Sequence, residues 1–220
     1  MQREFRLEVI RMTTETIQSP ETNCALPRMT YQEFLDWADE DVHAEWVDGE
    51  VVPKTTENAS HQQLVALLAA AMSTHVQSHD LGEVLSAPFQ IKLATRPSGR
   101  EPDILFVARE NLGRLHETFL DGPADLAIEI ISPQSRARDR GDKFYEYEAG
   151  GVREYWLIDT QSRRAEWHQL GSDGIYQKIA SDEHGVYRSR ELSGLWIDQA
   201  WLWQKPLPPL LDVLRIWKLI

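Results

Sequence analysis

The sequence predicts a mixed α/β sandwich with one central sheet. Short apolar runs near residues 103–107 and 125–131 have strand character, and helical patterns stand between such runs. A turn signal indicates a hairpin before them, and alternating segments follow them. From residue 58 the expected order is helix, three strands, helix, strand. Helices packed on a sheet bury the apolar faces of both, which gives this class of fold.

The first part of the chain is expected to hold an arm, a short helix and a hairpin. Residues 1–27 show no sustained periodicity, so we expect a flexible arm there. Thr30 and Glu33 make a capping box, which predicts a helix running through Trp37. Asp48-Gly49 is a two-residue turn signal between strand formers, which predicts a hairpin over residues 45–52.

The middle of the chain supplies the expected sheet and its helices. Asn58 or Ser60 caps a long helix whose apolar stripe includes Leu64 and Leu68. A loop is expected over residues 94–101, and a helix or loop near 109–117. A second helix is expected from about 135 to 149, ended by two glycines. The expected strands are 83–86, 88–93, 103–107, 125–131 and 154–158.

The last part of the chain predicts a β-meander and a terminal helix. Short alternating segments lie near residues 164–170, 174–180 and 185–190, and an apolar helix is expected from Leu210 to Leu219. We therefore expect three regions, which are an arm over 1–27, a domain over 28–205 and a helical tail over 206–220.

The composition of the chain favours one kind of cellular compartment. The 220 residues include one cysteine, Cys24, so no intrachain disulfide is possible and a reducing compartment is favoured. The longest apolar run, residues 64–72, is much shorter than the roughly 20 residues that span a bilayer. The first residues lack the pattern of a signal peptide. We expect a cytoplasmic protein without a membrane segment.

Two carboxylates fall on segments that should be buried strands. Asp103 begins one such strand, Glu129 lies inside another, and Lys143 follows on the next helix. A buried charge is tolerated when a metal ion, a cation or a raised pKa compensates it. Hard oxygen ligands suit Mg²⁺ or Mn²⁺, and the carbonyl of Ile130 would be a third ligand. With Lys143 orienting water or stabilising charge, the set predicts phosphodiester hydrolysis.

The helix that carries Lys143 presents further polar groups on the same face. Asp139 lies four residues before Lys143, and Tyr147 lies four residues after it. Plainer interpretations stay open: Asp139 and Lys143 form a surface ion pair, Tyr147 is a core aromatic, and Glu129 is neutralised by a buried arginine.

The net charge of −12 opposes long-range attraction of nucleic acid, whose affinity for proteins depends on phosphate contacts. Only local basic groups offset it, so DNA would bind a local groove. The candidates for nucleic-acid contact are Arg100, Arg136, Arg138 and Arg140. The cluster over 136–140 is equally consistent with a solvated face.

Several motifs, taken together, resemble one protein family. The chain is similar to the PD-(D/E)XK nuclease superfamily, and more closely to the Uma-two family of restriction-endonuclease-like proteins, from about Met29 to Leu195. The stretches that carry the resemblance are Glu45-Trp46-Val47-Asp48-Gly49-Glu50, Ser60-His61, Glu101-Pro102-Asp103-Ile104-Leu105-Phe106-Val107, Ile128-Glu129-Ile130-Ile131-Ser132-Pro133, Asp139-Arg140-Gly141-Asp142-Lys143 and Gly151-Val152-Arg153-Glu154-Tyr155-Trp156-Leu157-Ile158-Asp159.

The resemblance implies a restriction-endonuclease-like fold, a metal-dependent nuclease site on Asp103, Glu129 and Lys143, and a homodimer. It also implies that Glu45 and His61 approach that site. The sequence departs from the pattern twice. Ile131 stands where the superfamily has its lysine, which is moved here to the following helix. Ala44 stands where a tyrosine is expected.

Three hypotheses follow. The first is a Mg²⁺- or Mn²⁺-dependent DNA endonuclease of the PD-(D/E)XK type. The second is a non-catalytic module that retains the fold and binds nucleic acid or protein. The third is a homodimeric scaffold in which the tryptophans near the C-terminus make the contact.

Overall fold

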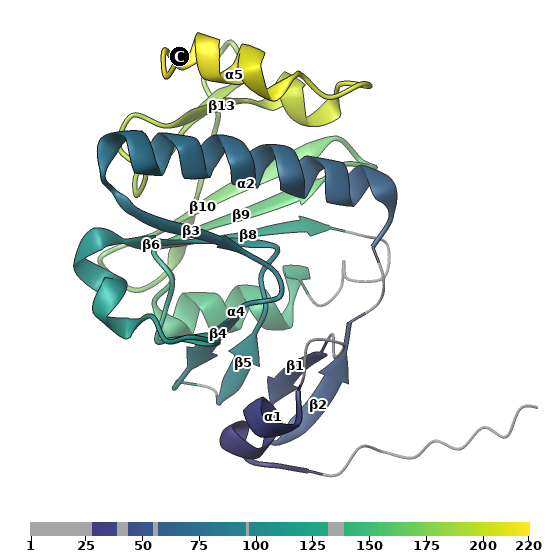
Figure 1. Cartoon of the computed structure of the whole chain (residues 1–220), viewed down its shortest axis with the longest axis vertical. Coiled ribbons are helices and arrows are strands. Elements are labelled where there is room, and N and C mark those ends of the chain that lie inside the picture. The colour runs from purple at the N-terminus through teal and green to yellow at the C-terminus, as the bar shows by residue number, and fades with distance from the viewer. Residues whose placement is uncertain (1–27, 39–43, 55–56, 96, 132–138) are drawn as a thin grey trace, which may run out of the picture.

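The structure, a computed structural model, describes residues 28–38, 44–54, 57–95, 97–131 and 139–220 (Figure 1). The arm expected over 1–27 and the basic residues Arg136 and Arg138 lie outside this part of the chain. Helices flank mixed sheets, so the predicted α/β class is confirmed. No helix among the described residues is long and apolar enough to cross a membrane.

A six-stranded sheet forms the centre of the molecule. Its order is β11-β10-β9-β8-β6-β3, and only β8 and β9 pair in parallel. A parallel pair needs a crossover connection, and helix α4 (Asp142–Gly150) lies in that connection. The strands are β3 (Gly82–Ser86), β6 (Ile104–Ala108), β8 (Leu126–Ile131), β9 (Glu154–Asp159), β10 (Arg164–Leu170) and β11 (Tyr176–Ile179).

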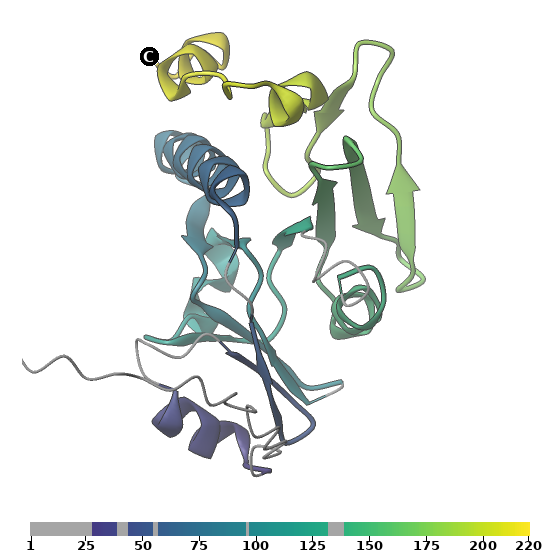
Figure 2. The same ribbon diagram turned by 90° about the vertical axis from the view of Figure 1, so that its right-hand side faces the viewer.

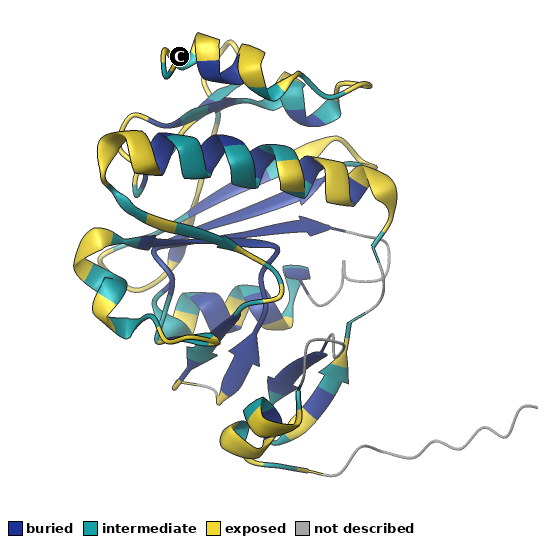
Figure 3. Ribbon diagram, viewed as in Figure 1, coloured by how far each residue is buried: buried dark blue, intermediate teal, exposed yellow. Residues whose placement is uncertain are grey.

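Two helices cover the two faces of this sheet (Figure 2). Alternate residues of a strand point to opposite faces, so Ile128 and Ile130 pack with helix α2 (Ala59–His79), while Ala127 and Ile131 pack with α4. Strands β8 and β9 are buried along their whole length (Figure 3). The near-continuous apolar pattern of both strands follows from burial on both faces.

A second sheet, of five strands, departs from the single central sheet that we expected. Its order is β2-β1-β5-β4-β7, and helix α1 (Tyr31–Trp37) packs on it. The predicted hairpin therefore exists but belongs to this sheet. Part of the expected loop over 94–101 is a strand. The strands are β1 (Ala44–Val47), β2 (Glu50–Pro53), β4 (Gln90–Leu93), β5 (Ser98–Arg100) and β7 (Phe119–Asp121).

The C-terminal part continues the central sheet only as far as β11. The next strand, β12 (Val186–Arg188), pairs with β13 (Trp196–Asp198) in a separate two-stranded sheet instead of extending a meander. The 3₁₀ helix η2 (Gln199–Trp203) follows, and α5 (Leu210–Ile216) packs on α2. A further 3₁₀ helix, η1 (Arg109–Arg114), follows β6.

Local chemistry explains where the predicted elements begin. The Thr30 hydroxyl and the Glu33 carboxylate cap α1 reciprocally, as the capping box predicts. Asn58, one of the two predicted caps, accepts a hydrogen bond from the His61 amide at 3.0 Å. Positive φ angles at Asp48 (49°) and Gly49 (88°) close the β1–β2 hairpin.

Candidate active site

The sheet register brings Asp103 and Glu129 together. Ile104 of β6 pairs with Ile128 of antiparallel β8. Asp103 directly precedes Ile104 and Glu129 directly follows Ile128, so the two acidic residues are opposite each other where the β6–β8 ladder ends. The amide of Ile130 donates to Asp103 Oδ2 at 2.7 Å. Both carboxylates are buried, with 8% and 3% of their residue surface exposed. The two predicted acids therefore lie side by side at one end of the central sheet.

Lys143 lies in the first turn of α4 and reaches this pair. Its Nζ atom is 2.7 Å from Glu129 Oε1, 2.8 Å from Glu45 Oε1 and 3.8 Å from Asp139 Oδ1. The Tyr147 hydroxyl, one turn further along, donates to Glu129 Oε1 at 3.0 Å. The i,i+4 pair with Asp139 thus exists, but it is the longest of the three contacts. The cation beside Glu129 is a lysine instead of an arginine.

Glu45 arrives from β1 of the other sheet and is held by Arg100. The Arg100 guanidinium donates to Glu45 Oε2 at 2.9 Å and to both oxygens of Glu146 at 2.6 and 2.8 Å. Arg100 is 2% exposed. We expected Arg100 to contact nucleic acid, but its hydrogen-bonding groups face carboxylates in the interior. The structure places it inside the cluster.

His61 and Lys54 border the cluster on the Asp103 side. His61 Nε2 lies 3.1 Å from Asp103 Oδ2, so this histidine, which the resemblance implied would approach the site, is next to the Asp103 carboxylate. Lys54 donates to the carboxylate of Glu101 at 2.8 Å and to its carbonyl oxygen at 3.1 Å. The sequence analysis did not identify Lys54, because Lys54 follows the hairpin and no sequence pattern relates it to Asp103 or Glu129.

Arg140, the described member of the predicted basic cluster, lies beside β9 and β10. It forms an ion pair with Glu166, and Asp159 Oδ2 is 3.9 Å away. Its side chain is 31% exposed, so part of it reaches the surface. Arg140 does not contact the Asp103–Glu129 pair.

The described residues of this cluster include more carboxylates than cationic side chains. Lys54, Arg100 and Lys143 are its cationic side chains within the described residues, and His61 is a fourth group that can carry charge. The buried carboxylates outnumber them and are Glu45, Glu101, Asp103, Glu129, Asp139 and Glu146.

The pKa values of Glu129 and Lys143 are both raised, for different reasons. Burial raises the pKa of Glu129 to about 8, and the nearby charges of Asp139 and Asp103 add to this effect against the opposing charge of Lys143. Burial alone would lower the pKa of Lys143, but the charges of Glu129, Glu45 and Asp139 outweigh it and raise that pKa. Lys143 therefore stays protonated near neutral pH.

Asp103 behaves in the opposite way. Burial alone would raise its pKa, but the hydrogen bond and charge of His61, the charge of Lys54 and the Ile130 amide lower it. For His61, burial is likewise outweighed by Asp103, and the pKa is raised. The two residues thus favour an ionised carboxylate beside a protonated imidazole.

The donor set suits a small hard cation. Asp103 Oδ1 and Glu129 Oε2 receive no hydrogen bond from any described residue, because the contacts use the other oxygen of each group. No three His, Cys, Asp or Glu side chains in the described ranges converge as a metal cage. Mg²⁺ usually takes one or two carboxylates and keeps several waters, so two carboxylates fit it.

A mixed α/β fold with two opposed carboxylates and an adjacent lysine is typical of restriction-endonuclease-like proteins. The chain belongs to the Uma2 family, which bears the description "Putative restriction endonuclease" and whose profile matches residues 31–200. This confirms the resemblance seen in the sequence motifs.

The chain is also similar to one curated protein and to one solved structure. The protein slr1290 of Synechocystis sp., described as uncharacterized, is 23% identical over 150 residues, which cover 67% of this chain and 77% of that protein. A crystal structure described as "a putative nuclease belonging to DUF820", from Anabaena variabilis ATCC 29413, has a TM-score of 0.66. It shares 17% identity and covers 79% of this chain and 97% of that one. At this identity the likeness shows the fold.

Proposed function

We propose that the protein is a divalent-metal-dependent DNA endonuclease. The observation that carries the proposal is the opposition of Asp103 and Glu129 across β6 and β8, with Lys143 Nζ 2.7 Å from Glu129. Membership of a family described as "Putative restriction endonuclease" supports the same class of reaction. The oxygens Asp103 Oδ1 and Glu129 Oε2, which receive no hydrogen bond from a described residue, support the need for a cation.

Asp103 and Glu129 would hold the cation through their oxygens Oδ1 and Oε2. The main-chain carbonyl of Ile130 is a third candidate, because a residue in a strand directs its N–H and C=O to the same side, and the Ile130 N–H points at Asp103. A bound Mg²⁺ or Mn²⁺ would supply an activated water and neutralise charge on the phosphate. His61 and the Ile130 amide fix the orientation of Asp103.

Lys143 acts as a fixed positive charge in this proposal. Because its pKa is raised, it does not accept a proton at neutral pH, so it cannot be the general base. Its ammonium group can instead donate to a phosphate oxygen as negative charge develops there. Glu45 holds Lys143 in place, and Arg100 holds Glu45. Glu45 and Arg100 are thus positioning residues.

Cleavage of a supercoiled plasmid tests the proposal. Wild-type protein should nick the plasmid with Mn²⁺ or Mg²⁺ and not with a chelator, and Asp103→Asn should lower the rate at least about a hundredfold. The amide oxygen of the asparagine side chain can still accept the hydrogen bond from the Ile130 amide, so folding is expected to survive. Asp121→Asn, an exposed site on β7, is the matched control.

Absence of cleavage, or equal cleavage by Asp103→Asn and wild type, would contradict the proposal. That outcome would favour a non-catalytic module that retains the fold. The homodimer implied by the resemblance stays a prediction, and sedimentation of the same preparations measures it.

A further inference from the structure

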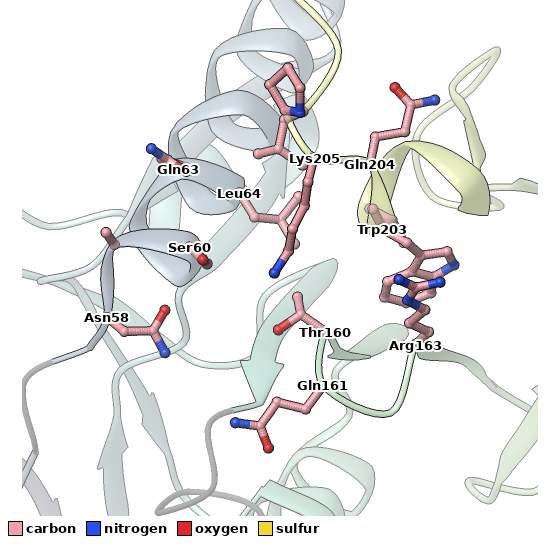
Figure 4. Close-up of a pocket in the computed structure, with 14 residues that line it drawn as sticks. Asn58, Ser60, Gln63, Leu64, Thr160, Gln161, Arg163, Trp203, Gln204 and Lys205 are labelled. Carbon is pink, nitrogen blue, oxygen red and sulfur yellow. The ribbon is translucent and has the colours of Figure 1, made fainter.

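A cavity of about 690 Å³ lies beside the central sheet, outside the carboxylate cluster (Figure 4). One wall is the N-terminal end of α2 and its cap, with Asn58, Ser60 and Gln63. A second is the β9–β10 turn, and the third is the segment 202–207. The volume is within the range of small-molecule and cofactor sites, about 300–1,000 Å³.

The chemistry of this cavity differs from that of the whole molecule. The chain carries a net charge of −12, yet none of the described residues that line the cavity is an aspartate or a glutamate. Arg163 and Lys205 are both in the lining, and Lys205 extends its ammonium group into the space between Ser60 and Thr160 (Figure 4). The cavity is therefore a locally positive site in an acidic protein, which suits an anionic ligand.

The remaining lining groups suit a planar polar ring. Trp203 contributes its indole to the lining, and Asn58 and Gln161 contribute side-chain amides from two walls (Figure 4). An amide carries both donors and an acceptor, as the edge of a nucleobase does. Aromatic stacking together with a basic groove is how proteins hold unpaired nucleotides.

The cavity adjoins the proposed active site. Ser60 in its wall directly precedes His61, whose ring contacts Asp103. Thr160 in its wall directly follows Asp159, which pairs with Ile131 at the same end of the sheet that presents Glu129. A strand whose scissile phosphate lay at Asp103 and Glu129 would therefore pass near the mouth of the cavity.

We propose that this cavity binds one unpaired nucleotide of a DNA strand. Trp203 stacks on the base, the amides contact its edge, and Lys205 with Arg163 contacts phosphate. The inference rests on the proposed nuclease function and names its substrate class, single-stranded or locally opened DNA. A paired base cannot enter, because its partner and neighbouring pairs hide both of its faces and its pairing edge.

Binding without cleavage tests this inference separately from the nuclease activity. The probe is a fluorescent 12-nucleotide oligothymidylate, titrated by anisotropy with the full chain in chelator at low ionic strength. A blunt duplex of the same length and free thymidine 5′-monophosphate are the other arms. We expect the single strand to bind at least about tenfold more tightly than either of them.

Variants with matched controls assign the binding to the cavity. Lys205→Glu and Trp203→Leu should each weaken oligonucleotide binding about tenfold or more, whereas Trp203→Phe should retain most of it because it keeps an aromatic face. Arg188→Glu makes the same charge change on β12, and Trp37→Leu removes an exposed indole from α1. Both controls should bind within about twofold of wild type.

Several outcomes would overturn the inference. They are no binding of the oligonucleotide, equal or tighter binding of the duplex, binding of the mononucleotide alone, and equal losses in cavity and control variants. If plasmid cleavage is present in any of these cases, the nuclease proposal stands and only the cavity assignment fails. If the cavity variants lose oligonucleotide binding while no preparation cleaves, the nuclease proposal fails and nucleotide binding stands.

Discussion

Lys143 Nζ lies 2.8 Å from Glu45 Oε1, and this ion pair joins two sheets. Lys143 belongs to α4, which packs on the six-stranded sheet, and Glu45 belongs to β1 of the five-stranded sheet. Both side chains are at most 1% exposed. The candidate site is therefore assembled from both sheets, and the loss of either partner leaves a buried charge.

Replacement of Lys143 by methionine should abolish plasmid cleavage and destabilise the fold. Glu129 and Glu45 would stay buried without their shared cation, and breaking a buried pair costs roughly 3–5 kcal/mol. Urea denaturation measures the free energy of unfolding. Lys178→Met is the control, because Lys178 also lies 2.7 Å from a carboxylate, that of Glu166, but is 50% exposed. The Lys178→Met variant should lose less than about 1 kcal/mol of unfolding free energy. Equal losses in the two variants would contradict the expectation.

Replacement of Arg100 by lysine should lower the turnover rate without lowering DNA affinity. Lysine keeps the charge but cannot span Glu45 and both oxygens of Glu146 as the guanidinium does. We expect kcat to fall at least about tenfold, with oligonucleotide binding in chelator unchanged. Arg153→Lys, at a half-exposed site near Asp125, is the control. A rise in KM with a smaller salt dependence would instead indicate that Arg100 contacts phosphate.

Metal affinity should rise with pH. Glu129 must lose its proton to bind a cation, and its pKa is raised to about 8. Mn²⁺ binding should therefore release a proton below that pH and strengthen by up to about tenfold per pH unit. Calorimetry between pH 6 and 9, in buffers of different ionisation enthalpy, measures both quantities. Glu129→Gln should bind more weakly, with a shallower dependence on pH. A wild-type affinity that does not change with pH would contradict this.

His168 should make the fold less stable in mild acid. Burial lowers its pKa to about 4, and the charges of Lys178 and Arg140 contribute while Glu166 opposes them. Between the ordinary pKa of about 6.5 and this lowered value, the unfolded chain binds a proton that the native state does not. The contribution of neutral His168 to the free energy of unfolding is therefore fully present above about pH 6.5, and it is lost as the pH falls from there toward about 4.

His168→Phe tests this expectation. The ring of His168 already packs against Phe144, with centroids 5.0 Å apart, and its Nε2 atom has no partner among the described residues. Phenylalanine fits such a site and does not titrate. Denaturant unfolding at pH 8 and pH 5 should show wild type losing roughly 1–2 kcal/mol more than the variant between the two pH values. The same loss in both proteins would rule out His168 as the cause.

The central elements were predictable because their patterns are local. The apolar runs of β6, β8 and β9, the capping box at Thr30 and the hairpin turn at Asp48 all appear where the sequence places them. Strand β5 was not predictable, since Ser98-Gly99-Arg100 has no strand preference of its own. Pairing with β1 and β4 on both sides makes it a strand.

The candidate site was predictable only in part, for a similar reason. Asp103, Glu129 and Lys143 stand out because charges on apolar segments are unusual, and the structure brings them together. The partners of Arg100 are 46 and 55 residues away in sequence, so no local pattern indicates that it is buried. Lys54 and Glu146 were missed because only tertiary packing brings them to the cluster.

The location of Glu45 in the β1–β2 hairpin has a dynamic consequence. If this hairpin separated from its sheet, it would withdraw the carboxylate that holds Lys143, so local unfolding of β1 and β2 would release the lysine as well. A cation that binds the closed arrangement must then oppose that opening. Backbone amides of the hairpin, far along the chain from Asp103 and Glu129, should exchange with deuterium more slowly when the cation is bound.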